Sequence, residues 1–283
     1  MINRINRTID KAKQEKRLAF IGLVPILPES LEHTLEVAKV IIDSGIDIAM
    51  VHIPNWFPWM EGGTLQKAAR NPRHAGVTRD DIFRFIKRLR EEYPDLPIMD
   101  MTLFDTAMTM GIDRFIELSQ KADVDGYDLP DYPLFQTNDK FGFHKWCLEN
   151  NRHLILDVSY EECISQEGTI EYELLDETCK NARGFMFVMN APGGKSGSNE
   201  KLSDEQLKNA VLRAKSRLKE NGNEDTTVSV VCGISNAQDL EKVKNSGADS
   251  FMIGSAYIKM LLEGEHLENI SKYIKDIKEM CKY

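Results

Sequence analysis

Three acidic side chains interrupt stretches of sequence that are otherwise apolar. Asp100 lies in IMDMTLF, Asp128 in GYDLPD and Asp157 in LILDVS. His52 falls near the end of a fourth apolar run, IAMVHI, and Glu61 follows it in NWFPWMEGG. A bare carboxylate in an apolar strand is costly to bury unless it is paired or faces a solvated cavity, so these groups are candidates for function. Carboxylates of this kind predict proton transfer to and from a small molecule.

Two glycine-containing turns predict a phosphate site. VVCGISNAQDLEKV places Gly233 and Ser235 between an apolar run and a helix-like stretch, and DSFMIGSAYIKMLL places Gly254 and Ser255 in the same way. Glycine lets backbone N–H groups approach an anion, and the positive end of the following helix favours its charge. Ordinary strand-to-helix turns are the plainer interpretation, since Gly and Ser are common there.

A third glycine cluster, NAPGGKSGSNE, contains GGKSG but does not match a nucleotide-binding P-loop. That motif needs a glycine five residues before the glycine that precedes the lysine, and Met189 stands there. We expect Gly193 and Gly194 to contribute backbone N–H groups to the phosphate site from a lid-like loop. Lys195 either adds charge to that site or is a solvated loop lysine.

These residues follow short apolar runs that alternate with amphipathic stretches. The apolar runs predict eight strands, at residues 17–24, 47–53, 96–104, 124–130, 153–159, 184–190, 227–235 and 250–256. The spacing of apolar residues by three and four predicts helices at 30–45, 79–93, 111–122, 141–151, 170–181, 205–222 and 236–247. Repeated strand–helix units imply parallel strands, and eight of them predict a single (β/α)8 barrel, an α/β fold of the TIM-barrel type. A doubly wound open sheet is the rival, but its first turn would be glycine-rich and here reads PILPES.

The predicted organisation is one domain, with residues 1–17 as a short N-terminal helix and residues 18–283 as the barrel. In such barrels the active site lies at the carboxyl ends of the strands, which is where the residues above fall.

Composition excludes several classes of protein. The net charge of −9 argues against non-specific nucleic-acid binding. No apolar run is long enough to span a membrane, and the charged N-terminus lacks the apolar region of a signal peptide. Five cysteines without a CxxC pair favour reduced thiols and a cytoplasmic location, and indicate neither a disulfide framework nor a zinc site.

Taken in order along the chain, several motifs resemble the tryptophan synthase alpha subunit family. They are GIDIAMVHIP, EGGTLQKAA, HAGVTRDDIF, MGIDRF, VDGYDLPDYP, GFMFVMNAPGGKSG, CGISNAQ and GADSFMIGSAYIK, and the similarity runs from about residue 18 to residue 259. The resemblance implies a TIM barrel that cleaves indole-3-glycerol phosphate to indole and glyceraldehyde 3-phosphate, a retro-aldol reaction without a cofactor. It also implies that Gly193 or Gly194, together with the two turns described above, grips the phosphate.

The sequence departs from the family at the catalytic carboxylates. The family has a Glu at the end of strand two, where this chain has Met50, and an Asp in the following loop, where this chain has Glu61. Retro-aldol chemistry needs a base for the hydroxyl proton and an acid for the leaving carbon, and Met50 can supply neither. The loop that helps the family bind a beta subunit is also changed, at Asn55, Trp56 and Phe57, which argues against that partnership.

New polar groups stand where the family has apolar or small residues. Asp128 and Asp157 occupy strand-end positions near the family's indole, and His52 replaces a small residue. Asp100 either contacts the substrate or points outward toward a helix, and His52 either contacts it or is a structural histidine. Asp131 matches an Asp of the family and either serves the site or orients a loop.

The aromatic residues Trp56, Phe57 and Trp59 predict a wall over the barrel mouth, or else packing at a loop or subunit interface. With Trp56 we group Phe185 and Phe187, together with His52 and Asp100, as predicted substrate-binding residues.

The predicted function is that of a lyase or aldolase acting on a phosphorylated small molecule more polar than indole-3-glycerol phosphate. Glu61, Asp128 and Asp157 are the predicted catalytic residues. The sequence leaves four alternatives open: the family's own activity with a relocated base, an isomerase, a non-catalytic regulator that binds a phosphorylated ligand, and a metal-dependent enzyme using Asp100, Asp128, Asp157 and His52. It also leaves a homo-oligomer open.

Overall fold

The computed structural model describes residues 3–55, 61–192 and 200–283, and in this part of the chain eight parallel strands close into a barrel. The strands follow one another around the barrel in sequence order, so each pairs with the next and β8 pairs with β1. They are β1 (Ala19–Pro25), β2 (Ile48–His52), β3 (Ile98–Met101), β4 (Gly126–Asp128), β5 (His153–Val158), β6 (Phe185–Met189), β7 (Thr227–Val231) and β8 (Ser250–Ile253). The predicted (β/α)8 fold is confirmed.

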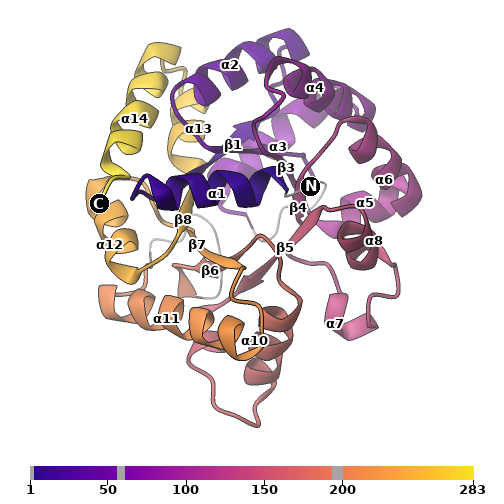
Figure 1. Ribbon diagram of the computed structural model, residues 1–283. Coiled ribbons are helices and arrows are strands. Elements are labelled where there is room, and N and C mark those ends of the chain that lie inside the picture. Colours follow the sequence, from indigo (N-terminus) through magenta and orange to yellow (C-terminus); the bar gives the residue numbers. More distant parts are fainter. Residues whose placement is uncertain (1–2, 56–60, 193–199) are drawn as a thin grey trace.

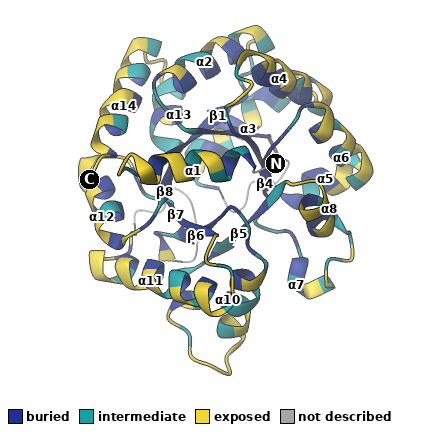
Figure 2. Ribbon diagram, in the orientation of Figure 1, coloured by how far each residue is buried: buried dark blue, intermediate teal, exposed yellow. Residues whose placement is uncertain are grey.

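Helices surround the barrel and connect its strands (Figure 1). Those in the described residues are α1 (Arg4–Gln14), α2 (Leu31–Asp43), α3 (Gly63–His74), α4 (Arg79–Glu92), α5 (Phe104–Met110), α6 (Ile112–Lys121), α7 (Leu134–Thr137), α8 (Phe143–Glu149), α9 (Tyr160–Cys163), α10 (Ile170–Asn181), α11 (Asp204–Glu220), α12 (Ala237–Ser246), α13 (Ser255–Leu262) and α14 (Leu267–Met280). Their exposed residues lie on the outer surface and the strands are buried within (Figure 2). Within the described residues, no helix combines the length and apolar character needed to cross a membrane.

Local signals in the sequence set where several helices begin. Thr78 before α4 and Ser203 before α11 each form a capping box with the residue three positions later, which satisfies N–H groups at the helix start. The sequence pattern does not predict α3, because that helix is largely polar and contains Pro72. Tertiary packing stabilises α3 instead, because its residues Leu65 and Ala69 are buried in the core.

The pairing of the strands decides which side chains face the barrel interior. Side chains alternate along a strand, and residues paired across a parallel ladder point to the same side. Gly126, for example, pairs with Met99 and with His153. An added Cβ on Gly126 would lie 2.9 Å from Ile5 of α1, the helix that covers the amino ends of the strands, which we call the barrel floor. By this register, His52, Met101, Asp128, Asp157 and Phe187 all face the interior.

The amino ends of the strands are closed by α1, which lies across them (Figure 1). Ile5, Ile9 and Ala12 recur on one face of α1 and are buried against the barrel floor. The predicted division into residues 1–17 and 18–283 stays a prediction.

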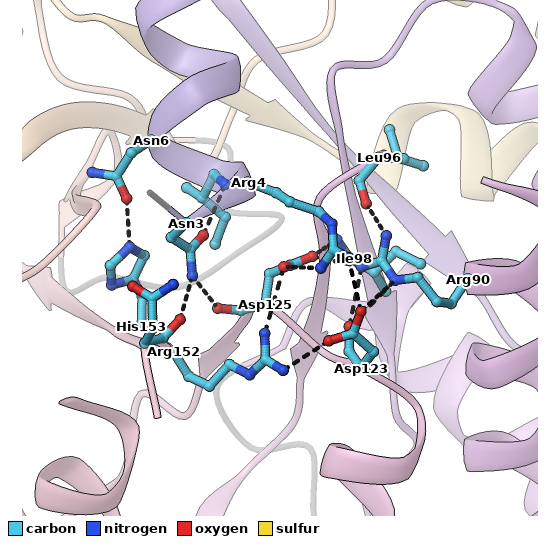
Figure 3. Close-up of polar contacts among 12 residues, drawn as sticks. Asn3, Arg4, Asn6, Arg90, Leu96, Ile98, Asp123, Asp125, Arg152 and His153 are labelled. Atoms are coloured by element: carbon cyan, nitrogen blue, oxygen red, sulfur yellow. Dashed lines mark hydrogen bonds and ion pairs between the residues drawn. The ribbon is translucent and has the colours of Figure 1, made fainter. Parts of the chain in front are cut away.

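Charged side chains lock α1 to the barrel floor (Figure 3). The buried carboxylate of Asp125 accepts hydrogen bonds from Arg4 at 2.8 Å and from Arg90 at 2.6 Å. Asp123 accepts from Arg4 at 2.8 Å and from Arg152 at 2.7 Å. Both of these carboxylates are therefore matched by guanidinium groups.

Candidate active site

A cavity opens at the carboxyl ends of the strands, the face on which TIM-barrel enzymes carry their active sites. It encloses about 840 Å³ including the space at its mouth, a size suited to a small-molecule ligand. Its walls are mostly apolar, and three carboxylates and a pair of glycine turns interrupt them. The lining residues are Leu23, Glu61, Leu65, Met101, Thr102, Leu103, Asp128, Pro130, Asp157, Phe187, Met189, Val231, Cys232, Gly233, Ile234, Met252, Ile253, Gly254 and Ser255.

Glu61 is held at the cavity wall by residues at the end of β2. Its Oε1 lies 2.7 Å from Nε2 of His52 and accepts a longer bond, 3.3 Å, from the amide of Asn55. Because a carboxylate oxygen only accepts, Nε2–H of His52 donates the shorter bond. Gln66 on α3 donates to the backbone carbonyl of Glu61 at 2.8 Å. The Glu61 side chain is buried, and its Oε2 has no hydrogen-bond partner in the described structure.

Asp128 on β4 and Asp157 on β5 line the same cavity from neighbouring strands. Burial raises the pKa of Asp128 to about 7, and the charge of Asp131 adds to the rise. Burial also raises the pKa of Asp157 well above its usual range, with further contributions from Asp128 and Glu162. One oxygen on each of the two aspartates is buried without a hydrogen-bond partner in the described structure. The pair therefore disfavours full ionisation.

Asp131 orients a loop, one of the two roles that the sequence left open for it. Its Oδ1 accepts a hydrogen bond of 2.5 Å from the backbone N–H of Phe104 at the start of α5. It does not line the cavity, and it acts on Asp128 only through its charge.

Asp100 points away from the cavity. It pairs in register with Tyr127, whose ring packs against Phe115 of α6 and Phe143 of α8 on the outer side of the barrel. Asp100 is fully buried there, and burial raises its pKa well above the usual range. The substrate contact predicted for Asp100 therefore finds no support, because the strand turns this side chain toward the helices.

The two predicted phosphate turns meet at one side of the cavity, where Gly233, Gly254 and Ser255 contribute to the lining. An added Cβ on Gly254 would lie 2.7 Å from Leu23, so only glycine fits there. The first helical hydrogen bond of α13 runs from Ile258 to Gly254, so the N–H groups of the preceding residues have no acceptor within the helix.

Ser235, which the sequence predicts to contact the phosphate, is engaged elsewhere. Its backbone N–H and its hydroxyl both donate to Oδ2 of Asp239 on α12, at 2.9 and 3.1 Å, and it does not line the cavity. Asp239 in turn pairs with Lys201 at 2.7 Å. Ser235 thus fixes the turn, and the phosphate contact predicted for it has no geometric support.

The structure adds Cys232 and Ile234 to the lining, which sequence reasoning missed. Cys232 and Gly233 have φ of +73° and +69°, so two consecutive residues adopt the left-handed region. A turn with two such residues points its backbone N–H and C=O groups in directions that an ordinary turn does not allow. The sequence signal for it is Gly233 alone, because cysteine has no special preference for this conformation.

Of the two phenylalanines predicted to bind substrate, only Phe187 lies at the cavity. Phe187 lines the cavity, while Phe185 packs beneath it in the barrel interior with ring centroids 5.1 Å apart. Trp56, Gly193 and Gly194 lie outside the described residues. The sequence marks Asn55 only as a change in the loop, whereas in the structure it contacts Glu61.

Among residues 3–55, 61–192 and 200–283, no group of three or more His, Cys, Asp or Glu side chains is placed to hold a metal ion. His52, Asp128 and Asp157 face the interior, whereas Asp100 faces the helices, so the four ligands suggested for a metal do not converge.

Fold and site together define a TIM-barrel protein with a carboxylate-containing cavity beside two glycine turns. The family model for the tryptophan synthase alpha chain matches residues 9–283, so the chain belongs to that family and the resemblance in its motifs is confirmed. Tryptophan synthase alpha chains from Prochlorococcus marinus and Caldanaerobacter subterraneus are 25% and 26% identical to it, over 99% of this chain and 94% and 100% of theirs. The crystal structure of the alpha subunit from Legionella pneumophila shares the fold with a TM-score of 0.82 at 19% identity, covering 99% of both chains.

Proposed function

We propose that this protein is a carbon–carbon lyase that cleaves a phosphorylated small molecule by a retro-aldol reaction without a cofactor. The observation that carries the proposal is one cavity with Glu61, Asp128 and Asp157 in its walls and the turns at Gly233 and Gly254 on its rim. The family relationship supports the reaction class. The non-phosphate half of the substrate would be more polar than indole, because carboxylates stand in an otherwise apolar wall.

The phosphate would bind at the turns after β7 and β8. Gly254 allows close approach, and the free N–H groups at the start of α13 favour an anion. Gly193 and Gly194, from the loop after β6, would complete this site. In the described residues no arginine or lysine lines the cavity, so backbone groups would carry most of the recognition.

Glu61 would act as the general base. Met50 faces the barrel interior one layer below His52, is fully buried and does not line the cavity, so it takes no part in proton transfer. His52 holds Oε1 of Glu61, which leaves Oε2 for the substrate. The histidine would thus be a positioning residue for the remaining carboxylate.

Asp128 and Asp157 would supply the second proton-transfer group. Two neighbouring carboxyl groups that resist ionisation together retain a proton near neutral pH. Glu61 would take the proton of the substrate hydroxyl and the carbon–carbon bond would break as the aldehyde C=O forms. The leaving carbon would then take the proton from the aspartate pair.

The first experiment is an assay with indole-3-glycerol phosphate, with and without a beta subunit, that follows the release of glyceraldehyde 3-phosphate. We expect little turnover, together with protection against thermal unfolding by the substrate's phosphate. Turnover at an ordinary enzyme rate would instead establish the family's own activity with Glu61 as the relocated carboxylate.

A second assay runs the reaction in the direction of bond formation. Glyceraldehyde 3-phosphate is incubated with a panel of nitrogen heterocycles, and its consumption is measured for the wild-type protein and for Glu61→Gln. Consumption that depends on Glu61 is expected. Consumption that is the same in the variant, or phosphate binding without any turnover, would favour an isomerase or a non-catalytic regulator.

The partners are proposals as well. The altered loop at residues 55–57 argues against a beta-subunit interface of the family's kind, and a homo-oligomer stays open.

A cytoplasmic location is supported by five cysteines that form no disulfide in the structure.

A further inference from the structure

Two aspartates in the cavity have acceptor oxygens that nothing in the described protein uses. Asp128 is 6% exposed and lines the cavity, and its Oδ1 has no hydrogen-bond partner among the described residues. Oδ1 of Asp157, on the neighbouring strand, is likewise buried and unpartnered. A buried carboxylate without a partner costs several kcal/mol unless something else supplies the missing bonds.

The side chains around Asp128 and Asp157 indicate which kind of ligand would bind their unpartnered oxygens. Apolar side chains flank the aspartates, among them Met101, Phe187 and Met189, and the described lining contains no lysine or arginine. In the described residues, the other titratable groups in this wall or beside the pair are Glu61, Asp131, Glu162 and Cys232, which add negative charge or none. Among the residues that the structure describes, none therefore brings a cation to this wall.

We propose that Asp128 and Asp157 bind a protonated nitrogen carried by the non-phosphate half of the substrate, set in a flat apolar group. This inference rests on the proposed function and names the class of substrate: a phosphate-bearing fragment joined to a cationic nitrogen base. A nitrogen with two N–H donors satisfies one oxygen of each aspartate. The rest of the group then packs on Phe187 and the methionines, which favour polarisable and cationic rings.

An organic cation fits this wall better than a metal ion. A hard divalent ion takes six or more oxygen ligands and zinc takes four ligands in a tetrahedral site, but no cluster of three suitable side chains exists among the described residues. Two acceptors in an apolar wall match a planar cation with two parallel donors.

The two roles of the aspartate pair are compatible. The pair keeps one proton and one negative charge, so a bound cation neutralises the wall. The proton remains available for the leaving carbon, and the ionised oxygen holds the nitrogen.

The test compares two flat ligands that differ in charge. Benzamidine is a cation at neutral pH, and benzamide is its neutral counterpart of nearly the same shape. Binding of each is measured by calorimetry in the presence of inorganic phosphate. Since a hydrogen bond to a charged group contributes about 1.5–3 kcal/mol, we expect benzamidine to bind at least about tenfold more tightly than benzamide.

Single substitutions test which residues cause the preference for benzamidine. Asp128→Asn and Asp157→Asn should each reduce the preference for benzamidine about tenfold or remove it. Asp100→Asn is the matched control, because it removes a buried carboxylate that faces the helices, and it should leave the preference unchanged. If the aspartate variants fail to fold, the comparison of benzamidine with benzamide on the wild-type protein decides by itself.

Failure of this inference is separable from failure of the proposed function. Protection of the wild-type protein against thermal unfolding by inorganic phosphate alone tests the anion site. Phosphate protection without any preference for benzamidine would overturn the cationic substrate and leave the phosphate-binding lyase standing. A preference for benzamidine without phosphate protection would support the aspartate site and count against the lyase.

Discussion

The two ends of the barrel treat buried carboxylates in opposite ways. Asp125 and Asp128 lie three positions apart, one just before β4 and the other at its end, and both are buried. Asp125, at the amino end, accepts from Arg4, from Arg90 and from the backbone of Ile98 (Figure 3). Asp128, at the carboxyl end, faces a cavity and keeps an oxygen with no partner in the described structure.

The difference separates stability from function. A carboxylate whose hydrogen bonds are all satisfied holds α1 to the barrel, and its removal takes a buried partner away from two arginines. A carboxylate that lacks partners destabilises the fold and retains its capacity for a ligand or a proton. The carboxyl end should therefore tolerate neutralising substitutions in folding but not in activity, and the amino end should show the reverse.

The largest effect is expected for Glu61→Gln. The variant keeps the size of the side chain but cannot accept a proton, so turnover in the aldol assay should fall by about a hundred- to ten-thousandfold. Thermal stability should change little. Glu149→Gln, an exposed substitution at the end of α8, is the control and should retain full activity. Equal loss in both variants would break the link between the cavity and catalysis.

At the opposite end, Asp125→Asn should cost stability without affecting the chemistry. The substitution removes the buried carboxylate that pairs with both Arg4 and Arg90 and leaves them only Asp123, and breaking such a buried pair costs about 3–5 kcal/mol. Denaturant unfolding measures the loss. Asp95→Asn, on the exposed loop before β3, should stay within about 0.5 kcal/mol of the wild type. A neutral result at Asp125 would mean that the arginine network does not hold the floor.

Asp128→Asn should stabilise the protein in a pH-dependent way. In the folded state the pKa of Asp128 is about 7 against an ordinary 3.8, so the folded protein binds more protons than the unfolded chain between these values. Wild-type stability therefore falls as pH rises through this window. At about 1.4 kcal/mol per pKa unit the loss reaches about 4 kcal/mol at most, and the variant is free of it.

The measurement is the difference in unfolding free energy between Asp128→Asn and the wild type across the pH range. The variant should be the more stable protein above about pH 7, and the advantage should vanish near pH 4. An advantage that is independent of pH would point to packing rather than to charge.

The smallest effect is expected for His52→Gln, which tests the positioning of Glu61. Glutamine keeps a donor near Oε1 but loses the geometry of the imidazole, so kcat should fall about tenfold while KM stays close to the wild-type value. His33→Gln is a matched control, because His33 also contacts a glutamate, Glu36 at 3.2 Å, but on the exposed surface of α2. A change in KM alone would make His52 a substrate contact instead.

The fold and one end of the site could be predicted from local patterns. Alternating apolar runs and amphipathic stretches indicated the barrel, and the rule that sites lie at strand ends brought Glu61, Asp128 and Asp157 to one cavity. Gly233 and Gly254, which line the cavity, could be picked out because glycines between a strand and a helix are visible in the sequence. Cys232 was not, because its positive φ has no signal in a cysteine.

What the sequence could not assign is the side of a strand. Parallel barrel strands are buried on both faces, so the residues around the aspartates in IMDMTLF and GYDLPD show no alternation of polar and apolar side chains. Only the register of β3 against β4 turns Asp100 toward the helices and Asp128 into the cavity.

By itself, then, the sequence determined that carboxylates stand near the ends of buried strands and that glycines follow β7 and β8, because strand length, turn chemistry and helix periodicity are local properties. The tertiary structure decided which of those carboxylates are paired with arginine, which face a ligand, and which histidine holds Glu61. These contacts join residues far apart in the chain or on opposite sides of a loop, and they exist only once the barrel has closed.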